Sequence, residues 1–235
     1  MQDRTFQEAL SENRFARHIR TLREPFHLIC GYGQTGTALV ESLTRRGQHA
    51  VVIDIDESRT SVIQLQELRE FVPALHGDAG VTRHLKEAGL QHPACAGVVA
   101  LTNDNEVNLK IAITAKLLNP KIKVISRADS HDVEKNMASF GTDLTVDPYT
   151  IFAERLYLAL KSPTKYLVQD WLISVPGTRL REEMRPPEGR WIVAGVGRFG
   201  SRMTATLDKA GVECTVIDVH PDRVKERPGS VLGRG

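Results

Sequence analysis

Short apolar runs alternate with longer segments of mixed polarity between residues 26 and 147. Each run has about five residues, the usual length of a strand that is buried on both faces. The runs are Phe26–Cys30, Ala50–Asp54, Phe71–His76, Ala96–Leu101, Ile122–Ser126 and Asp143–Val146. The segments between them have helical character and cover residues 34–47, 57–69, 80–89, 104–118 and 130–140. Because such strands are joined by right-handed helical crossovers, we predict an α/β fold, a doubly wound parallel six-stranded sheet of the Rossmann type.

The flanking segments have other patterns. Residues 1–25 carry five arginines among apolar residues, which predicts a basic N-terminal arm. The arm is either a simple extension or a linker that leaves a membrane helix, whose cytoplasmic flank favours basic residues. Residues 148–161 predict a helix that is apolar on more than one face. We expect this helix to pack against another subunit, and folding back onto its own domain is the alternative. Residues 162–190 are rich in Pro and Gly breaks and predict a linker, with a strand over Tyr166–Val175.

The chain repeats itself. Residues 28–56 and residues 192–220 align without a gap at an offset of 164. The shared positions include Gly31 and Gly195, Gly33 and Gly197, Gly36 and Gly200, Asp54 and Asp218, and Arg59 and Arg223. We predict that residues 191–235 hold an incomplete second copy, with a strand, a helix and a second strand, that stops near its third strand. Three such elements cannot cover a parallel sheet, so we expect a fragment of a longer protein, a degenerate copy, or a piece that joins another sheet.

The first copy contains a phosphate-loop motif in its full context. Gly31-Tyr32-Gly33-Gln34-Thr35-Gly36 follows a predicted strand and opens a predicted helix, whose N-terminus attracts a diphosphate. Asp54 lies 18 residues after Gly36, at the end of the next strand. A carboxylate there accepts from ribose hydroxyls and repels a 2′-phosphate, which favours NAD(H) or an adenosine nucleotide over NADP. The alternative is a tight turn beside an acidic strand end. In the second copy Phe199 is expected to narrow the loop, which favours a structural role.

Polar residues also follow the third, fourth and fifth strands. Asp78 is placed either to bind an adenine amino group or to cap the helix from residue 80. The stretch Thr102-Asn103-Asp104-Asn105 either lines the far half of a dinucleotide or caps the helix over residues 104–118. Arg127 is expected to pair with a phosphate. An ion pair with Asp129 or Asp132 is its alternative.

Composition narrows the class of protein. The 235 residues are 41% hydrophobic and 26% charged, which is typical of a globular domain. A net charge of +2 gives no electrostatic case for nucleic acid. The three cysteines are far apart and predict neither a disulfide framework nor a metal site. No apolar stretch is long enough to span a membrane, and the charged N-terminus is unlike a signal peptide. The eight histidines are scattered, and no catalytic constellation is recognisable.

The motifs together resemble a known family. The stretches Ile29–Asp54, Gly77-Asp78, Leu101–Asn108 and Val124–Arg127 are similar to the RCK domain (regulator of potassium conductance), also called KTN or TrkA-N, over roughly residues 26–160. The resemblance implies a non-catalytic regulatory module at the cytoplasmic face of the cell membrane, bound to the membrane subunit or domain of a potassium channel or transporter. It implies NAD(H) or an adenine nucleotide (ATP, ADP or AMP) as ligand, a homodimer through helix 148–161, and a tetramer or an octameric ring. The family's C-terminal ligand-binding subdomain is not recognisable, because residues 162–190 are too few for it.

The motif and the resemblance give one set of candidate nucleotide-binding residues. They are Gly31, Tyr32, Gly33, Gln34, Thr35, Gly36, Asp54, Ile55, Asp56, Gly77, Asp78, Ala79, Thr102, Asn103, Asp104 and Arg127, with Gly195, Gly197, Gly200 and Asp218 in the second copy. The leading hypothesis is a ring in which nucleotide binding favours one arrangement of subunits. An NAD-dependent oxidoreductase is the main alternative, although no proton donor or substrate pocket is visible. An interaction module with a vestigial fold is the third.

Overall fold

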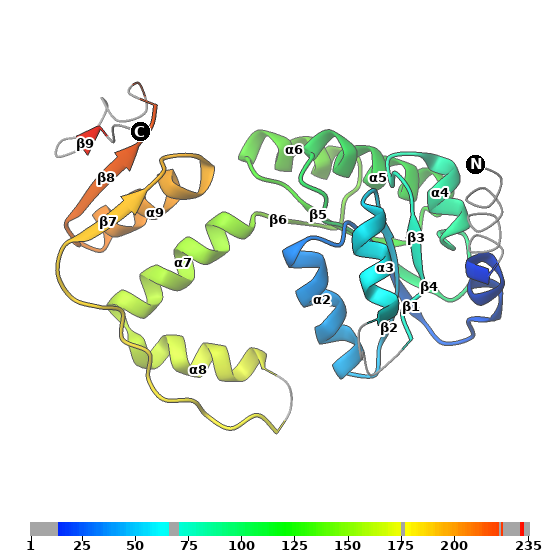
Figure 1. Cartoon of the computed structure of the whole chain (residues 1–235), viewed down its shortest axis with the longest axis horizontal. Coiled ribbons are helices and arrows are strands. Elements are labelled where there is room, and N and C mark those ends of the chain that lie inside the picture. The colour runs from blue at the N-terminus through cyan, green and yellow to red at the C-terminus, as the bar shows by residue number, and fades with distance from the viewer. Residues whose placement is uncertain (1–13, 66–70, 175–176, 221, 223–230, 233–235) are drawn as a thin grey trace. The chain divides into compact units, whose positions relative to one another are not determined.

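The computed structural model describes residues 14–65, 71–174, 177–220, 222 and 231–232, in two compact units, Met1–Val146 and Asp147–Gly235. The strands of the first unit are β1 (Phe26–Cys30), β2 (His49–Asp54), β3 (Ala74–His76), β4 (Cys95–Ala100), β5 (Lys123–Arg127) and β6 (Leu144–Val146) (Figure 1). The helices are α2 (Gln34–Arg45), α3 (Glu57–Leu65), α4 (Thr82–Glu87), α5 (Asn105–Leu118) and α6 (His131–Ser139). The six strands form one parallel sheet in the order β3-β2-β1-β4-β5-β6, which confirms the predicted doubly wound fold.

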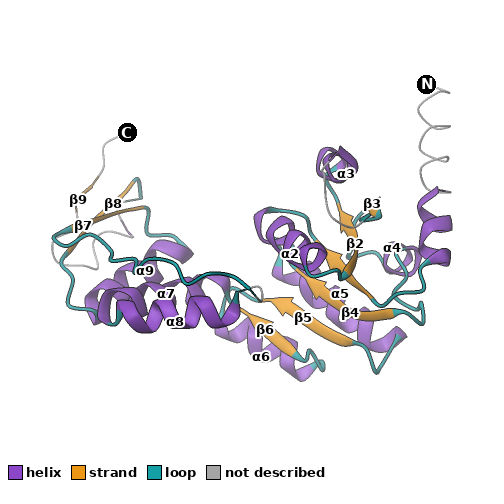
Figure 2. Ribbon diagram, turned by 90° about the horizontal axis from the view of Figure 1, so that it is seen from below, coloured by secondary structure: helices purple, strands orange, loops and turns teal. Residues whose placement is uncertain are grey.

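Helices cover both faces of this sheet (Figure 2). Along β1 the side chains alternate between the faces, as the pleat of a strand requires. Leu28 belongs to the cluster that includes Ile111 of α5, while Ile29 belongs to the cluster that includes Val40 of α2. Both β1 residues have no exposed surface. The strand order reverses between β1 and β4, so the loops that follow these two strands frame the ligand crevice of the fold.

The third strand and the N-terminal arm differ most from the expectation, while other boundaries of the first unit shift by only one or two residues. The third strand begins at Ala74 and not at Phe71, because Pro73 has no N–H to donate to the ladder. At the N-terminus, residues 14–21 are helical, and Phe15 and Ile19 are buried in the core cluster that contains Leu28. The first 13 residues of the expected arm, and the end of the helix expected over residues 57–69, lie outside the described residues.

The second unit contains α7 (Pro148–Lys161), α8 (Pro163–Ile173), β7 (Trp191–Ala194), α9 (Arg198–Lys209), β8 (Cys214–Asp218) and β9 (Val231–Leu232). Its strands form a parallel sheet in the order β7-β8-β9. The second copy therefore has a short third strand beyond the three elements expected, because Ile217 pairs with Val231 and Asp218 with Leu232. Arg223 lies outside the described residues. No helix in the described part of the chain has the length and hydrophobicity needed to cross a bilayer.

The strand expected over Tyr166–Val175 is wrong, since its residues up to Ile173 lie in helix α8, while Val175 lies outside the described residues. Pro163 stands in its first turn, where the fixed φ of proline favours a helix. Arg155 of α7 donates both to Tyr166 Oη at 3.4 Å and to Asp170 Oδ1 at 2.5 Å. Residues four apart lie side by side on a helix but about 13 Å apart along a strand, so this shared contact requires the helix.

Candidate functional site

The loop between β1 and α2 has the geometry that a phosphate loop requires. Gly31 adopts a φ of +103°, which a residue with a side chain rarely does. A Cβ on Gly36 would lie 2.1 Å from the carbonyl oxygen of Gly31, so α2 approaches the loop as closely as it does only because Gly36 is glycine. The N-cap of α2 is Gly33, and glycine has no side chain that could accept from the first N–H groups of the helix. The positive end of α2 is thus left for an anion.

The predicted ribose acid lies directly beside this loop. Asp54 is 4% exposed, at the end of β2. Its Oδ2 accepts from the N–H of Tyr32 at 2.5 Å, and its Oδ1 accepts from the N–H of Asp56 at 2.8 Å. The carboxylate therefore holds the phosphate loop against the end of β2. Each oxygen has a further lone pair, so accepting from a ribose hydroxyl is still chemically possible.

Arg59 places a cation at this loop, and it is not among the site residues predicted from the sequence. Arg59 extends from α3 with its Nη1 3.6 Å from Oδ2 of Asp54 and its Nε 3.4 Å from Oδ2 of Asp56. A Cβ on Gly33 would meet one atom within 4 Å, which is Nη1 of Arg59 at 4.0 Å. A basic residue shortly after the strand that carries the ribose acid is the signal that could have identified it.

The loop after β3 contributes a turn to the crevice. This loop is hydrogen-bonded to the end of β2, because the N–H of Gly77 donates to the carbonyl oxygen of Asp54 at 2.9 Å. Asp78 Oδ1 accepts from the N–H of Gly80 at 2.8 Å, whereas α4 begins at Thr82 with Val81 as its N-cap. The expectation that Asp78 caps this helix is therefore wrong, since its side chain closes the preceding turn. Its role toward adenine stays a prediction.

The loop after β4 is held by its own polar side chains. Asp104 is the N-cap of α5 and accepts from the N–H groups of Glu106 at 2.8 Å and Val107 at 3.3 Å. Asn108 is fully buried, and its Oδ1 accepts from the N–H of Thr102 at 3.0 Å and from its hydroxyl at 2.7 Å. Of the two alternatives for this stretch, the structure therefore has Asp104 in the capping role. The backbone N of Thr102 would lie 3.0 Å from a Cβ on Gly31, so the loops after β1 and β4 touch.

Arg127 lies at the end of β5, on the same edge of the sheet. Its Nη1 donates to Oδ1 of Asn103 at 2.9 Å, which links the loops that follow β4 and β5. Asn108 strengthens the same link, because its Nδ2 donates to the carbonyl oxygens of Thr102 at 3.0 Å and Arg127 at 3.3 Å. The structure therefore brings Arg127 to the crevice, and its pairing with a phosphate stays a prediction.

The second unit repeats the geometry of the first loop. Gly195 has a φ of +90°, and a Cβ on Gly200 would lie 1.8 Å from the carbonyl oxygen of Gly195. Asp218 is 5% exposed, and it accepts from the N–H of Val196 at 2.5 Å and from the N–H of His220 at 2.8 Å. The second loop is therefore folded in the same way as the first.

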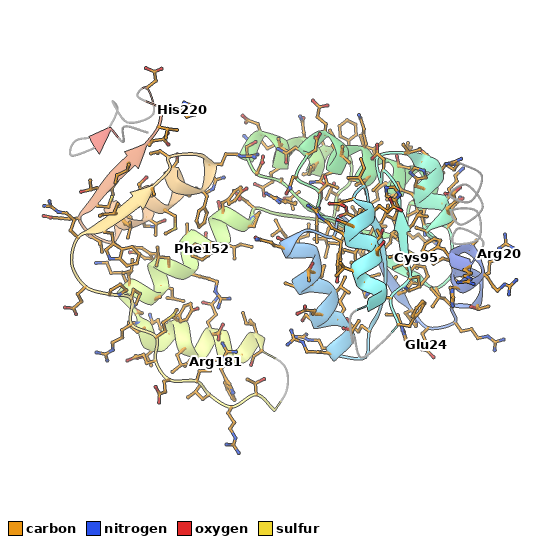
Figure 3. All side chains as sticks on the ribbon, viewed as in Figure 1. Arg20, Glu24, Cys95, Phe152, Arg181 and His220 are labelled. Carbon is orange, nitrogen blue, oxygen red and sulfur yellow. The ribbon has the colours of Figure 1, made fainter. Side chains whose placement is uncertain are left out.

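Phe199 does not narrow this second loop, contrary to the expectation. Its ring packs against α7, with its centroid 5.1 Å from that of Phe152 and 5.8 Å from that of Tyr149 (Figure 3 labels Phe152). Among the described residues, no atom lies within 4 Å of a Cβ built on Gly195 or on Gly197. The aromatic side chain thus contributes to packing within the second unit and leaves the loop open.

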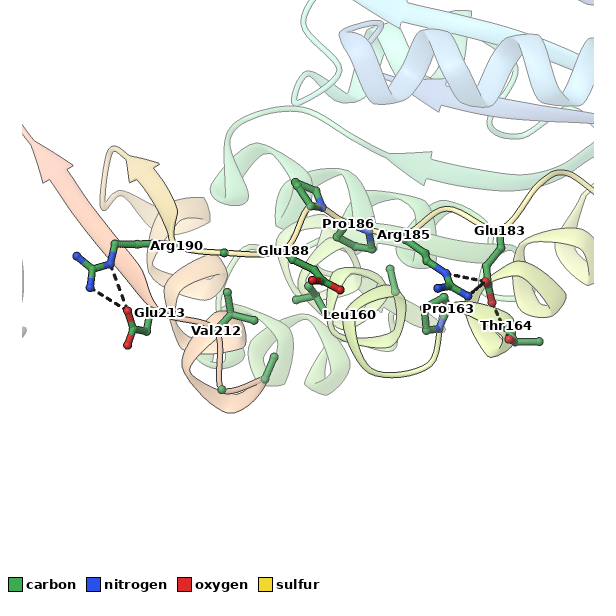
Figure 4. Close-up of a pocket in the computed structure, with 15 residues that line it drawn as sticks. Leu160, Pro163, Thr164, Glu183, Arg185, Pro186, Glu188, Arg190, Val212 and Glu213 are labelled. Atoms are coloured by element: carbon green, nitrogen blue, oxygen red, sulfur yellow. Dashed lines mark hydrogen bonds and ion pairs between the residues drawn. The ribbon is translucent and has the colours of Figure 1, made fainter.

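Two hollows compete as binding sites. The larger one, about 760 Å³, lies in the second unit between the ends of α7, α8 and α9 and the segment before β7 (Figure 4). Four of its charged groups are already paired, with Arg185 2.8 Å from Glu183 and Arg190 2.9 Å from Glu213, and Glu188 also lines it. The smaller hollow is lined by Tyr32, Gly33, Gln34, Thr37, Ala38, Glu41 and Arg59. We favour the smaller hollow, because it contains the open end of α2 and a cation, whereas size alone indicates no chemistry.

The described residues contain no group of three or more His, Cys, Asp and Glu side chains that could hold a metal. Burial raises the pKa of Cys95 to about 11, and burial also raises the pKa of Cys30 far above its ordinary value, so neither thiol is a nucleophile at neutral pH. His84 has its Nδ1 2.8 Å from the carbonyl oxygen of Asp78, and His76 has its Nε2 3.1 Å from that of Ile55. These histidines hold loops together, and the chemistry that the site offers is the binding of an anion.

Comparison with known proteins indicates which families have this arrangement. A family model described as TrkA-N domain matches residues 27–148 of the 235. Probable potassium channel protein 2 of Methanocaldococcus jannaschii is 28% identical over 155 residues, which are 64% of this chain and 43% of that protein. The Trk system potassium uptake protein TrkA homolog of Pyrococcus abyssi is 28% identical over 143 residues, which are 58% of this chain and 60% of that protein. The chain thus spans less than two thirds of the length of these relatives.

Solved structures share the fold. A structure of the GsuK channel bound to NAD superimposes with a TM-score of 0.64 at 14% identity, covering 91% of this chain and 48% of that chain. A structure of GsuK bound to ADP has a TM-score of 0.63 at 18% identity, covering 90% and 48%. At this level of identity the likeness is one of fold.

Proposed function

The chain belongs to the TrkA-N domain family, and from this premise we propose that it senses NAD(H) or an adenine nucleotide and thereby regulates potassium flux. One observation carries the proposal. The open N-terminus of α2 lies beside Asp54, whose carboxylate holds the loop through Tyr32 while keeping lone pairs for a ribose. That pairing of a bare helix end with a neighbouring acid suits an adenosine diphosphate group. The names of the relatives, a potassium channel and a potassium uptake protein, support the regulatory role.

The ligand class follows from the same loop. The related fold of GsuK has been solved with NAD and with ADP, two ligands that share an adenosine diphosphate group. The polar side chains at the ends of β4 and β5 favour sensing over catalysis, because Asp104, Asn108 and Arg127 are engaged in holding their loops. An oxidoreductase would need a proton donor beside the nicotinamide. We therefore propose a non-catalytic role.

The second unit supplies the means of coupling. Helix α7 keeps Ile151 46% exposed and Phe152 49% exposed, and neighbouring exposed apolar side chains offer a surface for contact with another subunit. We propose a homodimer through residues 148–161, assembled into a tetramer or an octameric ring at the cytoplasmic face of the membrane. Its partner would be the membrane subunit or domain of a potassium channel or transporter. Nucleotide binding shifts such a ring only if two arrangements of its subunits differ in their affinity for the nucleotide. This difference is typically about 1–3 kcal/mol per site.

Calorimetry of the chain with NADH and with ADP tests the binding step. The informative variant is Gly33→Ala, because a φ of −78° suits alanine and the nearest atom to its Cβ is 4.0 Å away. The fold should therefore be unchanged, while the methyl group occupies the space of the diphosphate and weakens binding about tenfold or more. Gly197→Ala is the matched control in the second loop and should bind like the wild type. Loss of binding in Gly197→Ala but not in Gly33→Ala would contradict the assignment to the first loop.

The regulatory step is tested in the full-length protein or in its complex with the membrane partner. Potassium flux should respond to NADH or ADP in the wild type and lose that response with Gly33→Ala. A response that survives in this variant, after calorimetry has shown that binding is lost, would reject gating through the first loop.

A further inference from the structure

We propose that Arg59 binds the diphosphate of the nucleotide, an inference that rests on the proposed function of the first loop and assigns it a cation. Arg59 belongs to α3, outside the glycine motif, and it lines the same hollow as Gly33 and Gln34. The second glycine of such a loop leaves out its side chain so that a diphosphate can approach the backbone. In this chain, the space next to Gly33 is bordered by the guanidinium of Arg59.

The present partners of Arg59 hold it loosely. Its distances to Asp54 and Asp56, 3.6 Å and 3.4 Å, exceed the length of a charge-assisted hydrogen bond. Its side chain is 45% exposed, and ion pairs with that much solvent contribute little stability. Asp54 would keep its two backbone donors if Arg59 moved away, so the exchange leaves no buried carboxylate unsatisfied. Arg59 can therefore change partners at low cost.

The charges around the loop explain why a cation is needed. Asp54 and Asp56 lie next to Arg59, and Glu41 is a third carboxylate that lines the hollow. The dipole of α2 supplies only about half a positive charge at its N-terminus. Without Arg59, a diphosphate would face three carboxylates with only this partial charge to offset them, and Arg59 adds a full positive charge at the loop. Arg59 is the basic residue among those that line the hollow, and a guanidinium matches two phosphate oxygens at once.

The proposal predicts a dependence on the number of phosphates. Adenosine, AMP and ADP are titrated into the full chain and into Arg59→Ala, Arg59→Lys and Arg83→Ala. Arg83 is the matched control, because it lies on α4, pairs with Glu87 at 3.4 Å and does not line the hollow. In Arg59→Ala the Kd for ADP should rise about tenfold or more, while the Kd for adenosine changes less than about twofold. Arg59→Lys should be intermediate, and Arg83→Ala should match the wild type.

The outcomes separate this inference from the proposed function. Wild-type affinity for ADP in Arg59→Ala, with binding intact in the wild type, would overturn the role of Arg59 and leave the proposed function standing. Equal weakening of adenosine and ADP would also overturn it, since Arg59 would then only position Asp54. If the wild type binds none of the three compounds, the inference about Arg59 fails, and the proposed function fails as well if NADH also does not bind. Should Arg59→Ala unfold, Arg59→Gln with the salt dependence of ADP binding decides, because the neutral side chain loses the charged phosphate contact and flattens that dependence.

Discussion

The loop of the first unit and the loop of the second share their hydrogen bonds but not their surroundings. Tyr32 donates to Asp54 at 2.5 Å, and Val196 donates to Asp218 at the same distance. The strand before the first loop is paired on both edges, and its Leu28 has no exposed surface. The strand before the second loop is paired with β8, and the equivalent Ile192 is 68% exposed. The loop geometry is therefore set by its local sequence and does not need a complete sheet.

The side chains described around the two loops differ. Arg59 lies next to Gly33, and its counterpart Arg223 lies outside the described residues. Phe199, which replaces Thr35, packs against α7 and joins the second loop to the helix proposed as a subunit contact. The comparison teaches that the repeated loop keeps its backbone geometry while the side chain at one of its positions, Thr35 or Phe199, determines whether it packs against a neighbouring helix.

Replacement of the third glycine of each loop by alanine should have the largest effect on the free energy of unfolding. The loss should be larger in the first unit than in the second. In Gly36→Ala the new Cβ would clash with a backbone oxygen at 2.1 Å, and α2 cannot move because Val40 is fully buried. We expect a loss of about 3 kcal/mol or more of unfolding free energy in the first unit. In Gly200→Ala the clash at 1.8 Å is as severe, and Thr204, the counterpart of Val40, is also fully buried. We expect a smaller loss there only because the strand β7 next to the loop is less well covered, with Ile192 68% exposed.

Two probes separate the units in this experiment. The two tryptophans, Trp171 and Trp191, both lie in the second unit, so their fluorescence in urea reports the unfolding of that unit. Hydrogen exchange of backbone amides in residues 26–146 reports the stability of the first unit. An equal loss of stability in the two variants would contradict this prediction, because it would show that α2 shifts as easily as α9 to relieve the clash.

Removal of the loop acid should have the next largest effect. Asp54→Ala leaves the N–H groups of Tyr32 and Asp56 without their acceptor, at a cost of about 2–3 kcal/mol. Asp54→Asn keeps one carbonyl oxygen and should cost less. Asp218→Ala removes the equivalent acceptor from Val196 and His220. It should cost less than Asp54→Ala, because the strand before the second loop is more exposed, with Ile192 68% exposed where Leu28 is fully buried. Urea unfolding gives the free energies, and rapid exchange of the Tyr32 amide in Asp54→Ala is the local signature. A protected Tyr32 amide in that variant would contradict the role of the carboxylate.

The sequence was sufficient for the features that follow from local patterns. Apolar runs of strand length with helices between them predicted the parallel sheet, and the glycine spacing with Asp54 predicted the loop. The physical reason is that strand burial, φ above zero and close helix approach each demand particular residue types at fixed spacing. The repeat extended the same inference to Asp218.

The sequence could not predict features that depend on packing between elements. Residues Tyr166–Val175 mix aromatic and branched side chains, a composition that suits either a strand or a helix, and Arg155 of the preceding helix determines the outcome. Arg59 lies outside the glycine motif, and its approach to Gly33 depends on how α3 packs. Asp104 suited both a cap and a ligand contact, and only the hydrogen bonds to Glu106 and Val107 distinguish the two.

Acidification should have the smallest effect and should act on both units through different carboxylates. In the first unit, Asp143 pairs with Lys116 at 2.6 Å and with Lys123 at 2.9 Å, and the hydrogen bond from Lys116 is the main cause that lowers its pKa. In the second unit, burial raises the pKa of Asp147, but hydrogen bonds from Arg202 and Thr150 outweigh it, and the pKa is lowered. Both groups thus hold their charge more strongly when folded than when unfolded.

A lowered folded pKa means that each carboxylate contributes stability above its unfolded pKa, near pH 4, and that this stability is lost as the pH falls toward the folded pKa. We expect Asp143→Asn to cost about 1 kcal/mol at pH 6, because the side chain is 25% exposed, and to make the first unit less sensitive to acid below pH 4. Asp147→Asn should do the same for the tryptophan signal of the second unit. Urea titrations at pH 6 and pH 3 measure both. If the difference between wild type and Asp143→Asn were as large at pH 3 as at pH 6, the charge of Asp143 would not be what stabilises the joint between α5, β5 and β6.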